Sequence, residues 1–193
     1  MKDIYSHIES HVDESIQQLF ELVRQPSISA QKVGFDKAPG LMKDLLERNG
    51  FEALIIPVPN DGLPTVCGYM AASGNPETAP TLLFYCHYDV QPVDPIDLWN
   101  TDPFEPTQIG DRLYGRGMSD DKGNIGARLA AIRAFIAERD GVPCNIKMFC
   151  EGEEESGSIN LPYLIAERGD DFKADACIWE GGGRNLNGDP FMY

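Results

Sequence analysis

The chain has 193 residues, a formal net charge of −15, 42% apolar side chains and 24% charged side chains. This length suffices for one well-buried domain, and the composition is ordinary for a soluble globular protein. The acidic charge argues against binding to nucleic acid or to anionic membrane surfaces, both of which require a basic face.

Features of the N-terminus and of the cysteines predict a cytoplasmic protein. The segment MKDIYSHIES lacks the apolar core of a signal peptide, and no apolar run reaches the ~18 residues of a membrane-spanning helix. The five cysteines lie in or beside apolar runs without a Cys-x-x-Cys pair, which is typical of reduced packing residues.

The first third of the chain predicts two helices followed by strands. Apolar residues over 4–23 recur at helical spacing and stop before Pro26, which predicts one amphipathic helix. A second helix is predicted over about 37–48, with Gly50 as its stop. Three apolar runs separated by turn residues then predict strands, namely ALIIPV, TVCGYM and TLLFYC.

The rest of the chain predicts an alternation of helices and strands. Segment 90–111, rich in Pro and Asp, predicts a long irregular surface loop. A helix over about 125–139, the strand NIKMFC, a helix through LPYLIAER and the strand DACIW follow, and then the Gly-rich loop EGGGRNLNGDP. The alternation predicts an α/β fold, a three-layer α/β/α sandwich with a mostly parallel central sheet. The last residues, PFMY, indicate a strand that has just begun, which we interpret as truncation.

Four groups of polar side chains are candidates for a site, and three of the four follow predicted strands, where ligands gather in α/β folds. His87 and Asp89 follow TLLFYC, and Glu180 follows DACIW. Asp120 and Asp121 follow LYGRGMS, and a glutamate cluster follows NIKMFC. Imidazole and oxygen donors of this kind suit zinc or manganese.

Two of these groups have a metal-binding and a simpler interpretation. Asp89 can accept the second ring N–H of His87 while the other nitrogen binds a metal, although a hydrogen-bonded histidine at a strand end is the alternative. Asp120 and Asp121 stand where a helix begins, so capping explains one of them. Neighbouring glycines permit a bent backbone that aims the other carboxylate inward.

The segment CEGEEESGS, residues 150–158, places four glutamates directly after a predicted buried strand. Such crowding costs free energy unless the turn is solvated or a cation stabilises it. Adjacent residues such as Glu154 and Glu155 point different ways, so one can bind a cation while the other holds a water as general base. Glu151 and Glu153 are interpreted as solvated. His7 and His11 are spaced like a metal pair but lack a third donor, and we interpret them as solvent-facing.

Five segments together resemble a known family. HYDVQP, LWNTDPFEP, LYGRGMSDDKG, NIKMFCEGEEESGS and DACIWEGG occur in the order and approximate spacing of the co-catalytic dinuclear metallopeptidases. This family includes carnosine dipeptidases, acetylornithine deacetylase and carboxypeptidase G. The resemblance covers nearly the whole chain and implies the zinc-exopeptidase type of fold.

The resemblance implies a site for two divalent metal ions, zinc first, with manganese or cobalt as alternatives. His87 and Glu180 would bind one metal, Asp120 would bridge both, and Glu155 would bind the second. Glu154 would be the general base, and Asp89 would orient His87. The family often has a cis peptide bond after the bridging aspartate, which here is the bond from Asp120 to Asp121.

The sequence departs from the family pattern in two ways. The second metal of the family also takes a histidine from near the end of a longer chain, and the lid or dimerisation domain is absent. We therefore interpret residues 1–193 as the N-terminal part of the catalytic domain of a homodimeric enzyme. The carnosine-dipeptidase branch usually has aspartate where Glu180 stands, so the substrate stays open.

These observations lead to three hypotheses. The first is a hydrolase that cleaves the amide bond of dipeptides or N-acyl amino acids with a metal-activated water. The second is a non-catalytic metal-binding or interaction domain with the same fold. The third is an acidic α/β domain whose carboxylates are solvated caps and turns.

Overall fold

Five strands form the central sheet of the chain, in the order β1-β2-β6-β3-β7. The computed structural model describes residues 1–180, 183–187 and 190–191. The strands of the central sheet are β1 (Glu52–Ile56), β2 (Thr65–Met70), β3 (Thr81–His87), β6 (Asn145–Glu151) and β7 (Ala176–Ile178).

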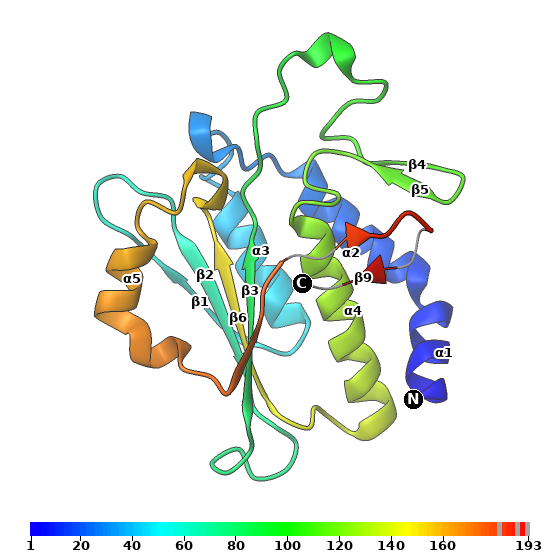
Figure 1. Cartoon of the computed structure of the whole chain (residues 1–193), viewed down its shortest axis with the longest axis vertical. Coiled ribbons are helices and arrows are strands. Elements are labelled where there is room, and N and C mark those ends of the chain that lie inside the picture. Colours follow the sequence, from blue (N-terminus) through cyan, green and yellow to red (C-terminus); the bar gives the residue numbers. More distant parts are fainter. Residues whose placement is uncertain (181–182, 188–189, 192–193) are drawn as a thin grey trace.

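Helices cover both faces of this sheet (Figure 1). On one face α3 and α4 pack against the strands, and α1 and α2 pack in turn against α4. On the other face lies α5, followed by the short 3-10 helix η4. The helices are α1 (Lys2–Ser10), α2 (Val12–Arg24), α3 (Ala38–Arg48), α4 (Lys122–Arg139), α5 (Leu161–Arg168) and η4 (Gly169–Phe172).

The predicted α/β/α sandwich is confirmed, and its sheet is mixed. β6 pairs with β3, and β3 with β7, in parallel, whereas β1 with β2 and β2 with β6 pair antiparallel. The connection between β1 and β2 is short, which explains why these two strands pair antiparallel, since a parallel pair needs a longer crossover. The parallel half aligns the carboxyl ends of β3, β6 and β7 at one edge.

Each face of the sheet has its own apolar core. The larger core lies under α3 and α4 and includes Met42, Ile125 and Met148, all at most 1% exposed. A smaller core joins Phe149 of β6 to Leu164 of α5. Both faces are therefore buried, as expected for strands that read as near-continuous apolar runs.

The single N-terminal helix predicted over 4–23 is wrong, because two helices meet at His11. The His11 N–H reaches the carbonyl oxygens of both His7 and Ile8, so α1 closes in a tight turn there. Neither Pro nor Gly marks this break, and the apolar spacing continues through it. The break lets α1 and α2 each pack on α4.

The predicted irregular loop over 90–111 contains ordered structure. Its end forms a two-stranded ribbon in which β4 (Thr107–Ile109) pairs with β5 (Arg112–Tyr114) across Gly110, whose φ is +64°. A short 3-10 helix, η2 (Ile96–Leu98), lies earlier in the loop. Strands of three residues carry too little alternation to be recognised from sequence.

The Gly-rich segment and the last strand are described in part. β8 (Gly183–Arg184) pairs with β9 (Pro190–Phe191), whereas residues 181–182, 188–189 and 192–193 lie outside the described residues. No helix within the described ranges is long and apolar enough to cross a membrane.

Candidate metal centre

His87 is the last residue of β3, and its side chain is fully buried. Its Nδ1 lies 3.1 Å from the main-chain oxygen of Asp89 and 3.4 Å from the Asp89 carboxylate. Both partners are acceptors, so Nδ1 carries a proton. The predicted orientation of His87 by Asp89 therefore has a geometric basis.

Carboxylates from three separate segments face the Nε2 atom of His87. Asp120 Oδ1 and Glu180 Oε2 each lie 2.9 Å from this nitrogen. Glu154 Oε2 lies 3.8 Å from it. The strand ends and the loop before α4 thus bring four of the predicted site residues to one point.

Asp89 also fixes the glutamate loop that follows β6. One oxygen of its buried carboxylate accepts the main-chain N–H of Glu154 at 3.2 Å, and the other accepts that of Glu155 at 3.0 Å. These bonds hold the short 3-10 helix η3 (Glu154–Ser156) beside His87. The Glu155 carboxylate itself accepts a hydrogen bond from the Gln91 amide at 2.7 Å.

Asp121 joins the site, although the sequence assigned the metal role to Asp120. Ligand atoms of His87, Asp121 and Glu180 all lie within 4.8 Å of one another. Asp121 is the N-cap residue of α4, accepts the His87 main-chain N–H at 3.1 Å and contacts the Asn124 amide. The bond between Asp120 and Asp121 is cis, as the resemblance implied.

A buried lysine anchors this aspartate pair to the rest of the fold. Lys122, only 2% exposed, donates from Nζ to the carbonyl oxygens of Leu22 at 2.9 Å and of Gln25 at 2.8 Å. Burial lowers the pKa of its ammonium to about 7. These bonds join the start of α4 to the last turn of α2 and to the residue that follows it.

The interpretation of Glu151 and Glu153 as solvated is wrong. Glu151 is 2% exposed and accepts a hydrogen bond from the Tyr85 hydroxyl at 2.6 Å. Glu153 is 7% exposed and accepts from the Leu63 N–H and the Asn160 amide, both at 2.8 Å. Their side chains lie under the loop, where hydrogen bonds from Tyr85, Leu63 and Asn160 hold three of their four carboxylate oxygens. Those partners could not be read from the local sequence.

The electrostatics of the site favour positive charge at His87. Burial acts to lower the pKa of His87, but the hydrogen bond and charge of Asp89 and the charge of Glu180 outweigh it and raise the pKa to about 10. Burial raises the pKa of Glu154, and the charges of Glu180 and Glu155 act in the same direction. A carboxylate with a raised pKa is better suited to accept a proton near neutral pH.

The donor set fits a divalent metal of the zinc type. One imidazole nitrogen and several carboxylate oxygens converge, and these are the ligands that zinc takes in catalytic sites. Carboxylates in this number repel one another in a partly buried site unless a cation or protons neutralise them.

Three residues that support the site were not predicted from the sequence: Gln91, Lys122 and Trp179. Gln91 holds Glu155, and the Trp179 indole N–H donates to Glu180 Oε1 at 3.1 Å. All three stand within the quoted motifs, one or two residues from predicted site residues, which was the available signal. The anchoring role of Lys122 could not be inferred from that signal, because its partners are main-chain oxygens about a hundred residues away.

Comparison with known proteins identifies the family. The model of Peptidase family M20/M25/M40 matches residues 83–190, which is more than half of the chain. The chain belongs to this peptidase family. The matched region contains His87, Asp120, Glu154 and Glu180, so the family assignment and the carboxylate cluster concern the same residues.

Members of the peptidase family with different names resemble the chain to a similar degree. Human Beta-Ala-His dipeptidase is 34% identical over 89% of this chain and 36% of its own. Succinyl-diaminopimelate desuccinylase of Delftia acidovorans is 32% identical over 82% of this chain and 41% of its own. An M20 family metallo-carboxypeptidase structure from Sulfolobus solfataricus is 39% identical with a TM-score of 0.82, covering 91% of this chain and 39% of that one. The chain thus spans about two fifths of the length of these relatives.

Proposed function

We propose that this chain carries the metal centre of a hydrolase that cleaves the amide bond of dipeptides or N-acyl amino acids. The observation that carries the proposal is the convergence of Asp120, Glu154 and Glu180 on Nε2 of His87. The names of the relatives, a dipeptidase, a desuccinylase and a carboxypeptidase, support amide hydrolysis as the shared chemistry.

The proposed metal ligands are His87, Asp120, Glu155 and Glu180, with zinc as the metal and manganese or cobalt as alternatives. Asp121 backs them by accepting the His87 main-chain N–H. When bound, divalent metal supplies Lewis-acid polarisation of the scissile carbonyl and lowers the pKa of the attacking water to roughly 7.

In the proposed mechanism Glu154 is the general base. It accepts a proton from the attacking water and delivers it to the leaving amine. Burial raises the pKa of Glu154, which favours proton transfer in both directions near neutral pH. Asp89 positions Glu154 through its main-chain N–H and positions His87 through Nδ1.

The experiment that tests this proposal replaces Glu154 by Gln in the protein as its gene encodes it. We expect the turnover of dipeptides and N-acyl amino acids to fall by about 100-fold or more, because a general base contributes about that much. Metal content should stay at the wild-type value, since Gln keeps the shape of the side chain and is not proposed as a ligand.

The matched control is Glu167→Gln, which alters an exposed glutamate on α5. This variant should keep wild-type turnover. A Glu154→Gln protein with most of the wild-type rate would contradict the assigned role. A wild-type protein that binds metal but hydrolyses no amide would favour a non-catalytic metal-binding domain.

A further inference from the structure

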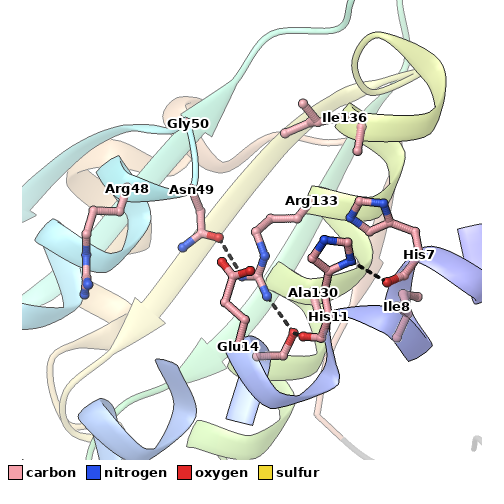
Figure 2. A pocket seen from close by; sticks show the side chains of 12 residues that line it. His7, Ile8, His11, Glu14, Arg48, Asn49, Gly50, Ala130, Arg133 and Ile136 are labelled. Atoms are coloured by element: carbon pink, nitrogen blue, oxygen red, sulfur yellow. Dashed lines mark hydrogen bonds between the residues drawn. The ribbon is translucent and has the colours of Figure 1, made fainter. Parts of the chain in front are cut away.

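His7 and His11 line a pocket of about 450 Å³ between the N-terminal helices and α4. Figure 2 shows His7 and His11 on one wall, with Arg133 of α4 beside them. Ile8, Ala130 and Ile136 form apolar parts of the lining. The side chain of His7 is 18% exposed, so it faces solvent less than the sequence indicated.

The two imidazole rings lie face to face. Their centroids are 4.1 Å apart, and their planes differ by 14°. The helical spacing persists between them although α1 ends here, because the His11 N–H still reaches the His7 carbonyl oxygen at 3.1 Å. Both rings are thus held on the same side of one helical turn.

Hydrogen bonds fix the same tautomer on both rings. Nδ1 of His7 lies 3.0 Å from Oε1 of Glu138, and Nδ1 of His11 lies 2.8 Å from the His7 carbonyl oxygen. An ionised carboxylate and a carbonyl can only accept, so each Nδ1 carries the hydrogen. Each Nε2 therefore has a free lone pair, and neither has a hydrogen-bond partner among the described residues.

The surrounding charges admit a cation. Glu138 contacts His7 directly, and Glu14 lines the pocket. Arg133 opposes them with one positive charge, while Arg48 is paired with Glu21 at 2.9 Å. Arg48 and Glu21 cancel each other, which leaves the carboxylates of Glu138 and Glu14 against the single positive charge of Arg133. The surroundings of the two histidines are therefore slightly negative.

We propose that His7 and His11 form a second metal site, distinct from the His87 centre, for a divalent ion that prefers imidazole, such as Zn²⁺, Ni²⁺ or Cu²⁺. The carboxylate on Nδ1 of His7 is the arrangement that orients metal-binding histidines and raises their basicity. In the proposed complex the Nε2 atoms of both rings bind the one ion, each at about 2.1 Å. With two protein donors the other positions hold water, and the ion joins the end of α1 to the start of α2.

The test uses Ni²⁺ and the His87→Gln chain, which lacks the central donor of the other site. Isothermal titration should give one bound equivalent of Ni²⁺, and adding His11→Gln should abolish it. Glu138→Gln should keep the stoichiometry and weaken the affinity by about 10-fold, as loss of such orienting carboxylates does. Of the three histidines in the sequence, the His87→Gln chain keeps only His7 and His11, so their two ring Hε1 signals also form a simple nuclear magnetic resonance probe. Ni²⁺ should broaden both signals.

The control is Glu167→Gln in the same His87→Gln chain, which should bind Ni²⁺ unchanged. The inference is overturned if the His87→Gln chain binds no Ni²⁺, or if the bound equivalent survives His11→Gln. The result does not depend on the proposed hydrolase, because the His87 centre has been disabled in every variant used.

Discussion

Trp179 shows how a single side chain outside the proposed ligand set can control the site. Its indole N–H donates to Oε1 of Glu180 at 3.1 Å, which leaves Oε2 directed at His87. The ring lies edge-on to Tyr85 with centroids 5.9 Å apart, yet the residue is 60% exposed. Burial of the ring therefore contributes little at this position, and we assign Trp179 the role of orienting Glu180.

Trp179→Phe keeps the ring and removes the N–H donor. We expect the affinity of the His87 centre for Zn²⁺, measured by isothermal titration, to fall by about 10-fold, as for other groups that orient ligands. The midpoint of thermal unfolding without metal should stay near the wild-type value, since little burial is lost. Trp99→Phe is the control, because Trp99 donates to Val93 in a different loop. Equal Zn²⁺ affinity in Trp179→Phe and wild type would contradict this role.

For single residues, the sequence predicted those that combine a metal-binding side chain with a position in a recognisable motif. His87, Glu154 and Glu180 stand at the ends of strands and Asp120 in the loop before α4, in a recognisable order, and the fold brings them together. The burial of Glu153 could not be predicted, because its partners, Leu63 and Asn160, lie on other segments. Tertiary hydrogen bonds, not local composition, decide whether a carboxylate in such a cluster is solvated.

At the scale of elements, Arg133 joins three helices at one point. From α4 its Nη1 donates to Gln18 of α2 and to Asn49 after α3, both at 2.8 Å, and its Nη2 donates to Ser15 at 2.7 Å. Burial lowers the pKa of this guanidinium, which shows that removing its charge from water costs free energy. Part of the free energy gained from the three hydrogen bonds offsets that cost. The three bonds fix the angle at which α2 and α3 meet α4.

Arg133→Met should destabilise the chain by about 2 kcal/mol, because it removes three charge-assisted hydrogen bonds. Urea unfolding followed by circular dichroism measures this loss. Arg139→Met is the matched control on the same helix, since Arg139 makes exposed contacts, an ion pair with Asp3 at 2.7 Å and a hydrogen bond to the Glu138 carbonyl oxygen. Such pairs contribute about 0–1 kcal/mol. Equal effects of the two substitutions would show that the Arg133 junction adds nothing.

Element boundaries were predictable where a residue type enforces them. Gly50, with φ of +87°, follows α3 as predicted, because glycine adopts this conformation without steric cost. The break at His11 and the β4–β5 ribbon could not be predicted, since both depend on how the segments pack. The mixed sheet likewise required the order of the strands, which hydrophobic patterns do not give.

At the scale of the whole molecule, the acidity and the cysteines acquire separate explanations. Part of the charge of −15 is directed inward, because Asp89, Asp121, Glu151 and Glu153 are all buried. The five cysteines are all free thiols, as predicted. Cys86 and Cys150 are neighbours on β3 and β6 and fully buried, whereas Cys177 on β7 is exposed.

The thiols should therefore react with an aromatic disulfide reagent in a fixed order. At pH 8 we expect one equivalent of thiol per native chain to react rapidly, and we assign it to the exposed Cys177. The hydrogen bond from Cys86 and burial raise the pKa of the Cys150 thiol, and burial raises the pKa of the Cys67 thiol to about 12, so both react slowly. In strong denaturant all five should react. Folding raises the pKa of Cys67, so the stability this thiol contributes is complete below about pH 8.5 and is lost as the pH rises toward 12. Cys177→Ser is the control and should remove the rapid phase of the thiol reaction. A rapid phase that persists in this variant would mean that the sheet protects its thiols less than the packing indicates.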